Sequence, residues 1–139
     1  MSSKLVEFLY PLPDLKRSPW SLLRWWESRR PAFNAIVGGT GLVTLGAVHF
    51  LSWLPPNSWS PPLVPELILI ALYGVLANVC YTGGFATELA VRKFLGDGAP
   101  RPGPALLRMG LTFSVGLTLF PAAIAGLDWA FRLLRYLLR

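Results

Sequence analysis

Polar and charged side chains recur at helical spacing beside two long apolar stretches. Glu27, Arg30 and Asn34 follow the spacing i, i+3, i+7 just before the first stretch, which places them on one helix face. A second row follows one helix face where the second stretch ends: Asn78, Tyr81, Glu88 and Arg92. Carboxylates beside a tyrosine can transfer protons, and carboxylates beside arginines form ion pairs. The residue types in these two rows therefore allow either proton transfer or ion pairing.

Antiparallel packing brings the two rows to the same depth, so we expect them to form one cluster. Polar groups at membrane depth are costly unless they are partnered. We therefore expect Glu27 to pair with Arg30 and Glu88 to pair with Arg92, bridged by the two asparagines. The leading interpretation is a structural lock that fixes the register of the helices. A site for a ligand, a lipid or a partner protein is the alternative.

The two rows also carry a resemblance. The strings Glu27-Ser-Arg-Arg-Pro-Ala-Phe-Asn34 and Asn78-Val-Cys-Tyr-Thr-Gly-Gly-Phe-Ala-Thr-Glu88 resemble a pair of motifs in small bacterial membrane proteins of unknown activity. The resemblance covers residues 27–34 and 78–88, and it implies a bacterial origin with the polar cluster as the functional centre. A tyrosine is usual in these motifs where this chain has Phe33, so a hydroxyl is missing there.

The other reactive side chains give no catalytic or metal signature. His49 is the single histidine, and one imidazole cannot supply both axial ligands of a haem, so we interpret it as structural. Asp128 lies at a similar depth and can pair with His49 or with Arg132. Cys80 is expected to be a buried free thiol. We expect no catalytic residue, no bound metal and no cofactor.

Three apolar stretches must position these side chains. Of the 139 residues, 53% are hydrophobic and 14% are charged, which is too apolar for a soluble domain of this length. About 20 apolar residues in a helix cross a hydrocarbon core, and we expect such spans at residues 32–54, 64–85 and 105–129. The predicted fold is an all-α integral membrane protein with three transmembrane helices, and residues 32–139 form its transmembrane domain.

The segments outside the spans are basic and rich in tryptophan. Residues 1–31 are predicted to be a cytoplasmic interfacial part, with an arm over residues 1–17 and an amphipathic helix from Pro19 to Arg29 at the headgroup boundary. Ser18 is expected to cap this helix. Pro121 is expected to kink the third span, and residues 129–139 to form an amphipathic tail at the opposite interface.

The positions of Lys and Arg predict the orientation. Six precede the first span, none lies in the first loop, four flank the second loop and three lie in the tail. Ten against three places the amino terminus in the cytoplasm, and the resemblance implies the bacterial inner membrane. The net charge of +6 is distributed around the spans and forms no single basic patch. The expected partner is therefore the lipid bilayer and not nucleic acid.

Small residues recur every four positions along the third span. They are Gly110, Ser114, Thr118, Ala122 and Gly126. This spacing makes a ridge along which a second helix backbone can approach closely. The first span offers a matching surface made of Ala35 and Gly39 together with Gly38, Gly41 and Gly46, so packing within the chain is the first interpretation and contact with a second copy is the other.

Three classes of function are compatible with this sequence. The leading hypothesis is an accessory, assembly or interaction subunit of a membrane complex, because packing surface is abundant and catalytic signatures are absent. The alternative is a transporter or channel component that works as an oligomer, since three spans are too few to enclose a usual transport path. The third is a membrane enzyme that acts on lipid-like substrates through Glu27, Glu88 and Tyr81.

Overall fold

The protein is helical throughout the part that the computed structural model describes, which is residues 18–56, 62–96 and 102–138. Its elements are α2 (Pro19–Glu27), α3 (Arg30–Trp53), α4 (Leu63–Leu95) and α5 (Gly103–Leu137). Three segments are long and apolar enough to cross a membrane. The first consists of α2 and α3 together, the second is α4, and the third is α5. The predicted all-α fold with three candidate spans is therefore confirmed. The predicted arm over residues 1–17 lies outside the described residues.

The start of α2 follows the expected cap. Ser18 is extended and its hydroxyl accepts a hydrogen bond from the Ser21 amide at 3.3 Å, with Pro19 in the first turn. The helix stops at Glu27 because Pro31 cannot donate to the ladder. The chain turns once, with the Arg29 amide donating to the Trp26 carbonyl at 3.1 Å, and α3 begins at Arg30.

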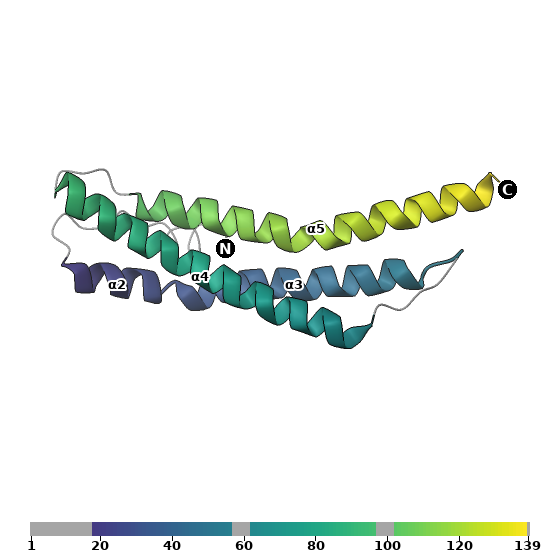
Figure 1. The fold of residues 1–139 in the computed structure, drawn as a ribbon, viewed down its shortest axis with the longest axis horizontal. Coiled ribbons are helices and arrows are strands. Elements are labelled where there is room, and N and C mark those ends of the chain that lie inside the picture. Colours follow the sequence, from purple (N-terminus) through teal and green to yellow (C-terminus); the bar gives the residue numbers. More distant parts are fainter. Residues whose placement is uncertain (1–17, 57–61, 97–101, 139) are drawn as a thin grey trace, which may run out of the picture.

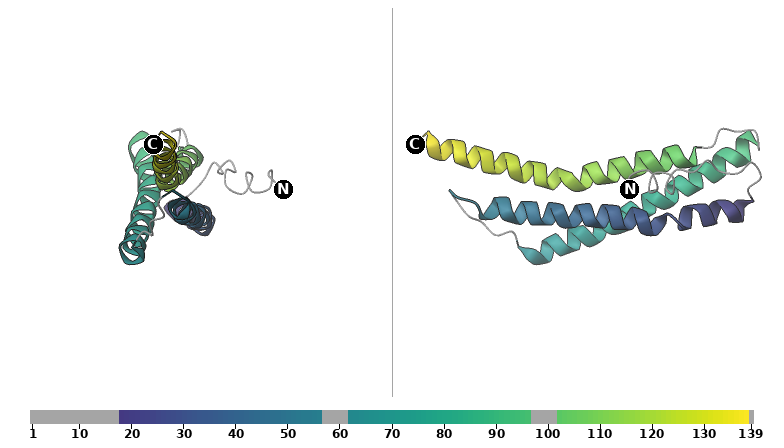
Figure 2. Two further views of the ribbon diagram at one scale, coloured as in Figure 1. Left: turned by 90° about the vertical axis from the view of Figure 1, so that its right-hand side faces the viewer. Right: turned by 180° about the vertical axis from the view of Figure 1, so that it is seen from behind.

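α2 continues along nearly the same direction as α3 and does not turn across it (Figures 1 and 2). From the tryptophan-rich composition we expected α2 to lie along the headgroup boundary. Trp20 is exposed, but Leu22, Trp25 and Trp26 are buried within the bundle. The apolar face of α2 is therefore at least partly covered by protein, because it packs against α3 and α4.

α3 and α5 form the most extensive helix pair, and α4 crosses this pair at an angle (Figures 1 and 2). α4 has 33 residues and α5 has 35, which correspond to about 50 Å of helix each against a hydrocarbon core of about 30 Å. Both helices are longer than one crossing needs. The predicted C-terminal tail is accordingly the last part of α5, which bends near its middle, where Pro121 lies (Figure 1).

The small-residue ridge of α5 packs within the chain along its middle. Ser114 and Thr118 are buried, and a methyl group added to Gly41 of α3 would lie 3.8 Å from the Thr118 methyl. Farther along α5, a methyl group added to Gly126 would lie 3.9 Å from a side-chain methyl of Leu51. Ala122 is partly buried, whereas Gly110 is exposed.

The matching surface on α3 contains only part of the expected set. Ala35 and Gly39 are exposed, and a methyl group on Gly39 would meet nothing within 4 Å. A methyl group on Gly38 or Gly46 would likewise meet nothing within 4 Å. Gly41, which belongs to the expected set, makes the contact together with Thr44 and Leu51. The reason is that α5 lies over the face of α3 that carries Val37, Gly41 and Thr44, whereas Ala35 and Gly39 lie on roughly the opposite side of the helix.

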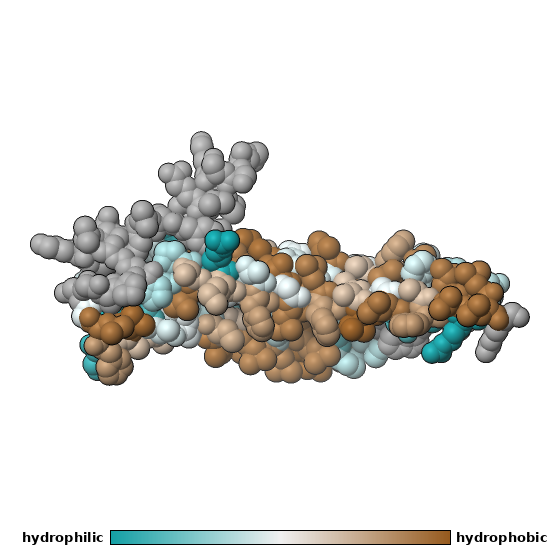
Figure 3. Space-filling view, turned by 90° about the horizontal axis from the view of Figure 1, so that it is seen from above, coloured by the Kyte–Doolittle hydropathy of each residue, from teal (hydrophilic) through white to brown (hydrophobic). Residues whose placement is uncertain are grey.

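Many large apolar side chains are exposed on the bundle, and brown, apolar areas cover much of the face that Figure 3 shows. On α4 the exposed set includes Leu67, Ile68, Leu69, Leu72, Val75, Leu76 and Val79. Only 6% of the most apolar window of this helix is buried inside the chain. Water cannot face such a surface favourably, so lipid or another protein must cover it.

Candidate functional site

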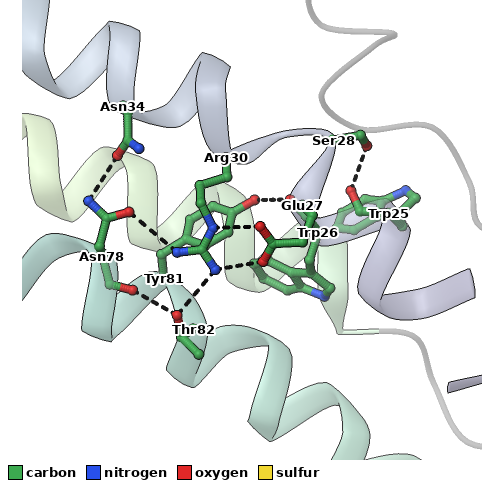
Figure 4. A network of polar contacts seen from close by, with 9 residues as sticks. All are labelled: Trp25, Trp26, Glu27, Ser28, Arg30, Asn34, Asn78, Tyr81 and Thr82. Carbon is green, nitrogen blue, oxygen red and sulfur yellow. Dashed lines mark hydrogen bonds and ion pairs between the residues drawn. The ribbon is translucent and has the colours of Figure 1, made fainter. Parts of the chain in front are cut away.

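Arg30 is the centre of a polar network that joins three helices (Figure 4). Its Nε and Nη2 atoms donate to the two carboxylate oxygens of Glu27 at 2.9 and 2.7 Å, across the turn between α2 and α3. Nη1 and Nη2 also donate to Asn78 Oδ1 and Thr82 Oγ1 of α4, each at 3.3 Å. The guanidinium lies 4.9 Å from the centroid of the Tyr81 ring. One side chain thereby connects α2, α3 and α4.

The two asparagines meet across the helix pair. Asn78 Nδ2 donates to Asn34 Oδ1 at 3.1 Å and to the Gly74 carbonyl at 3.0 Å. The structure therefore brings together four of the predicted residues, Glu27, Arg30, Asn34 and Asn78. Sequence reasoning did not include Thr82, which lies one turn beyond Asn78 and was detectable by that spacing alone.

Tyr81 and Glu88 lie deeper, around the indole of Trp26. The Tyr81 hydroxyl donates to the Trp26 carbonyl at 2.5 Å, and Trp26 Nε1 donates to Glu88 Oε2 at 2.7 Å. Glu88 is 3% exposed and Trp26 is 1% exposed. Arg92, which we expected beside Glu88, is partly exposed in the last turn of α4. The described partner of the buried carboxylate is thus a tryptophan.

Two glycines make room for this buried group. A methyl group on Gly84 would lie 2.8 Å from Cη2 of Trp26, so the indole rests directly on the α4 backbone. A methyl group on Gly103 would lie 2.8 Å from Cδ of Glu88. The Glu88 carboxyl therefore packs against the first residue of α5, where the helix dipole favours a negative charge.

A second polar set lies at the middle of the bundle. The Tyr73 hydroxyl donates to the Ser114 carbonyl at 2.7 Å, and the Thr118 hydroxyl lies 2.8 Å from that of Tyr73. Thr44 of α3 donates to the Thr118 carbonyl at 2.9 Å. Residues that were predicted only as small ridge residues therefore also take part in hydrogen bonds between all three spans, through the backbone carbonyls of Ser114 and Thr118 and through the Thr118 hydroxyl.

At the far end of the bundle, His49 and Glu66 tie α3 to α4. His49 Nε2 lies 2.9 Å from Glu66 Oε2, a pairing that the sequence did not indicate. Asp128 pairs with Arg132 at 3.0 Å, which is one of its two expected partners. Cys80 is exposed on the outer surface of α4, so the expectation of a buried thiol was wrong.

These polar groups bind mainly to one another. The Arg30 network and the Trp26 group connect helices through paired donors and acceptors. Within residues 18–56, 62–96 and 102–138, no three His, Cys, Asp or Glu side chains gather as metal ligands would. Comparisons with protein-family models, with curated proteins and with solved structures found no match. The fold and the site define a small helical protein of the membrane type.

Proposed function

We propose that the protein is a non-enzymatic accessory, assembly or interaction subunit of a membrane-protein complex. We place it in the cytoplasmic membrane of a bacterium, with the amino terminus in the cytoplasm. The asymmetry of Lys and Arg supports this orientation, and the resemblance of residues 27–34 and 78–88 supports the bacterial source.

The observation that carries the proposal is how the polar groups are used. Arg30 holds Glu27 and Asn78, and Glu88 accepts from Trp26 in a buried position. An enzyme site needs a nucleophile or a proton-transferring group directed at a space where a substrate can react. Here the same side chains are directed at each other, so their contribution is to hold the helices in register.

The interior also favours a packing role over transport through a single chain. The cavity between α3, α4 and α5, lined by Phe33, Ala77 and Phe113 among others, has a volume of about 60 Å³. A cavity of this size holds at most a few water molecules and makes no continuous path. The outer apolar faces are far larger, and they are the surfaces on which another membrane protein can pack.

Photocross-linking in native membranes tests this function. A photoreactive amino acid replaces either Leu76, which is 60% exposed on α4, or its neighbour Ala77, which is 7% exposed. We expect Leu76 to cross-link to one membrane protein of defined mass and Ala77 to cross-link only within the chain. The two positions differ in depth by about 1.5 Å, so depth does not confound the comparison.

Two results would contradict the proposal. Cross-links from Leu76, and from the equally outward Leu42, to lipid alone would show that no protein partner covers these faces. Cross-links only to further copies of this chain would favour the oligomeric transporter or channel component instead.

A further inference from the structure

An open groove with a volume of about 680 Å³ runs along α4 beside the start of α3. Its lining residues are Arg30, Ala71, Gly74, Val75, Asn78, Val79 and Thr82. From Ala71 to Thr82 the groove extends about 16 Å along the helix axis. It therefore follows α4 for about three turns, and Arg30, Asn78 and Thr82 of its lining belong to the Arg30 network.

The groove changes from apolar to polar along its length. Ala71 and Val75 line the part nearest the middle of the span, and Val75 is 63% exposed. Arg30 and Thr82 line the other end, where the span approaches the boundary of the bilayer. An occupant that matches this gradient has a hydrocarbon chain at one end and a polar group at the other.

The polar end presents two opposite charges side by side. Arg30 is cationic, and the Glu27 carboxylate contacts it at 2.7 Å while its side chain remains 47% exposed. The pair is neutral overall, so it does not select a net charge. A headgroup with a phosphate for Arg30 and an ammonium for Glu27 complements both members at once.

The polar end also keeps hydrogen-bonding capacity in reserve. A guanidinium has five N–H donors, and four of those on Arg30 have acceptors among the described residues. Asn34 is exposed, and within the same residues its amide nitrogen has no acceptor. Phosphate oxygens accept from such donors, whereas hydrocarbon cannot.

From this juxtaposition we infer that the groove binds a zwitterionic phospholipid with a primary ammonium, of the phosphatidylethanolamine class. Its acyl chain lies along Ala71, Val75 and Val79. Its phosphate binds Arg30, and its ammonium binds Glu27. This site goes beyond the proposed subunit function and needs no partner protein, so it can be tested on the purified chain.

Native mass spectrometry measures the retained lipid directly. The intact protein in mild detergent is incubated with equimolar phosphatidylethanolamine, phosphatidylcholine and phosphatidylglycerol that carry identical acyl chains. We expect the wild type to retain one phosphatidylethanolamine in preference to the other two. The preference should be about tenfold over phosphatidylcholine, which offers no ammonium N–H for the Glu27 carboxylate.

Three variants separate the parts of the site. Val75→Phe should fill the groove and reduce retention of all three lipids about tenfold. Val64→Phe is its control, because Val64 is 68% exposed and outside the groove lining. Glu27→Gln leaves Arg30 without its counter-charge, so the preference should change from phosphatidylethanolamine to phosphatidylglycerol. Glu66→Gln, at the other end of α4, should leave the preference as it is.

The outcomes that would overturn the inference are distinct. If the wild type binds phosphatidylglycerol best, the positive charge of the protein selects the lipid, and the pair of Glu27 and Arg30 does not. Equal retention by Val75→Phe and Val64→Phe would show that the lipid lies elsewhere. A wild type that retains no lipid would refute the site outright, and none of these results would affect the cross-linking test of the subunit function.

Discussion

Replacing Gly84 with alanine should damage the contact between α2 and α4. The added methyl group would lie 2.8, 3.2 and 3.6 Å from three carbons of the Trp26 ring. The indole cannot easily move away, because it is 1% exposed and its Nε1 is bonded to Glu88 at 2.7 Å. Gly83 is the matched control, since a methyl group there meets nothing within 4 Å.

The control allows the magnitude to be worked out. Alanine stabilises a helix relative to glycine by about 1 kcal/mol, and both variants receive this gain. Only Gly84→Ala also forces a methyl group into a filled space, which costs about 1–3 kcal/mol. The unfolding free energy of Gly84→Ala should therefore lie about 1–3 kcal/mol below that of Gly83→Ala.

Reversible unfolding by SDS in mixed micelles, followed by tryptophan fluorescence, measures this difference. Gly83→Ala should be as stable as the wild type or slightly more stable. Equal midpoints for the two variants would refute the reasoning, because they would mean that Trp26 does not lie on the α4 backbone.

The remaining predictions use the same assay. Ser114→Leu should lower the unfolding free energy by about 1–3 kcal/mol through overpacking. Val115→Leu, on a more exposed face, is the control and should have little effect. Equal unfolding free energies for the two variants would mean that the ridge faces lipid. Tyr73→Phe should cost about 0.6–1.7 kcal/mol by removing a hydrogen bond between spans, and an unchanged midpoint would place its hydroxyl elsewhere. Glu88→Ala should lower the unfolding free energy by about 1–3 kcal/mol because it leaves the buried indole N–H of Trp26 unpaired. Glu66→Ala removes a partly exposed pair with His49 and should lower it by less than about 1 kcal/mol. A larger loss for Glu66→Ala would contradict the assignment of the buried carboxylate.

The spans were predictable because their signal is local. An apolar run long enough to cross a bilayer is visible in sequence without knowledge of any contact. The pairing of Glu27 with Arg30 was predicted from helical spacing, although the structure has a turn between them, with α2 ending at Glu27 and α3 beginning at Arg30. The turn keeps the two side chains adjacent, so the spacing argument gives the same pair.

The tryptophans show what composition does not specify. Trp residues near basic residues are typical of a membrane boundary, and Trp20 is indeed exposed. Trp26 is instead a central buried residue, whose acceptor Glu88 lies 62 residues away in sequence. Leu22 and Trp26 are four residues apart and so share one face of α2, and this spacing was the signal in the sequence that could have revealed a buried face.

Other features depend on tertiary packing alone. Gly83 and Gly84 are adjacent residues of the same type, and the sequence does not distinguish their roles. Only the position of α2, which brings Trp26 onto Gly84, decides which of them needs to lack a side chain. The pairing of His49 with Glu66 likewise depends on the angle at which α4 crosses α3, which no local pattern specifies. Crossing angles follow from side chains on both helices together.

The juxtaposition of Asn34 and Asn78 tests the account most directly, because the polar lock and the lipid groove both require it. In a Cys80→Ala background, cysteines at positions 34 and 78 are treated in native membranes with a short bifunctional thiol cross-linker. We expect a high yield for this pair, whose amide groups are 3.1 Å apart, and none for position 34 paired with position 66. Failure of the 34 and 78 pair to cross-link, with both cysteines shown to be reactive, would contradict the account.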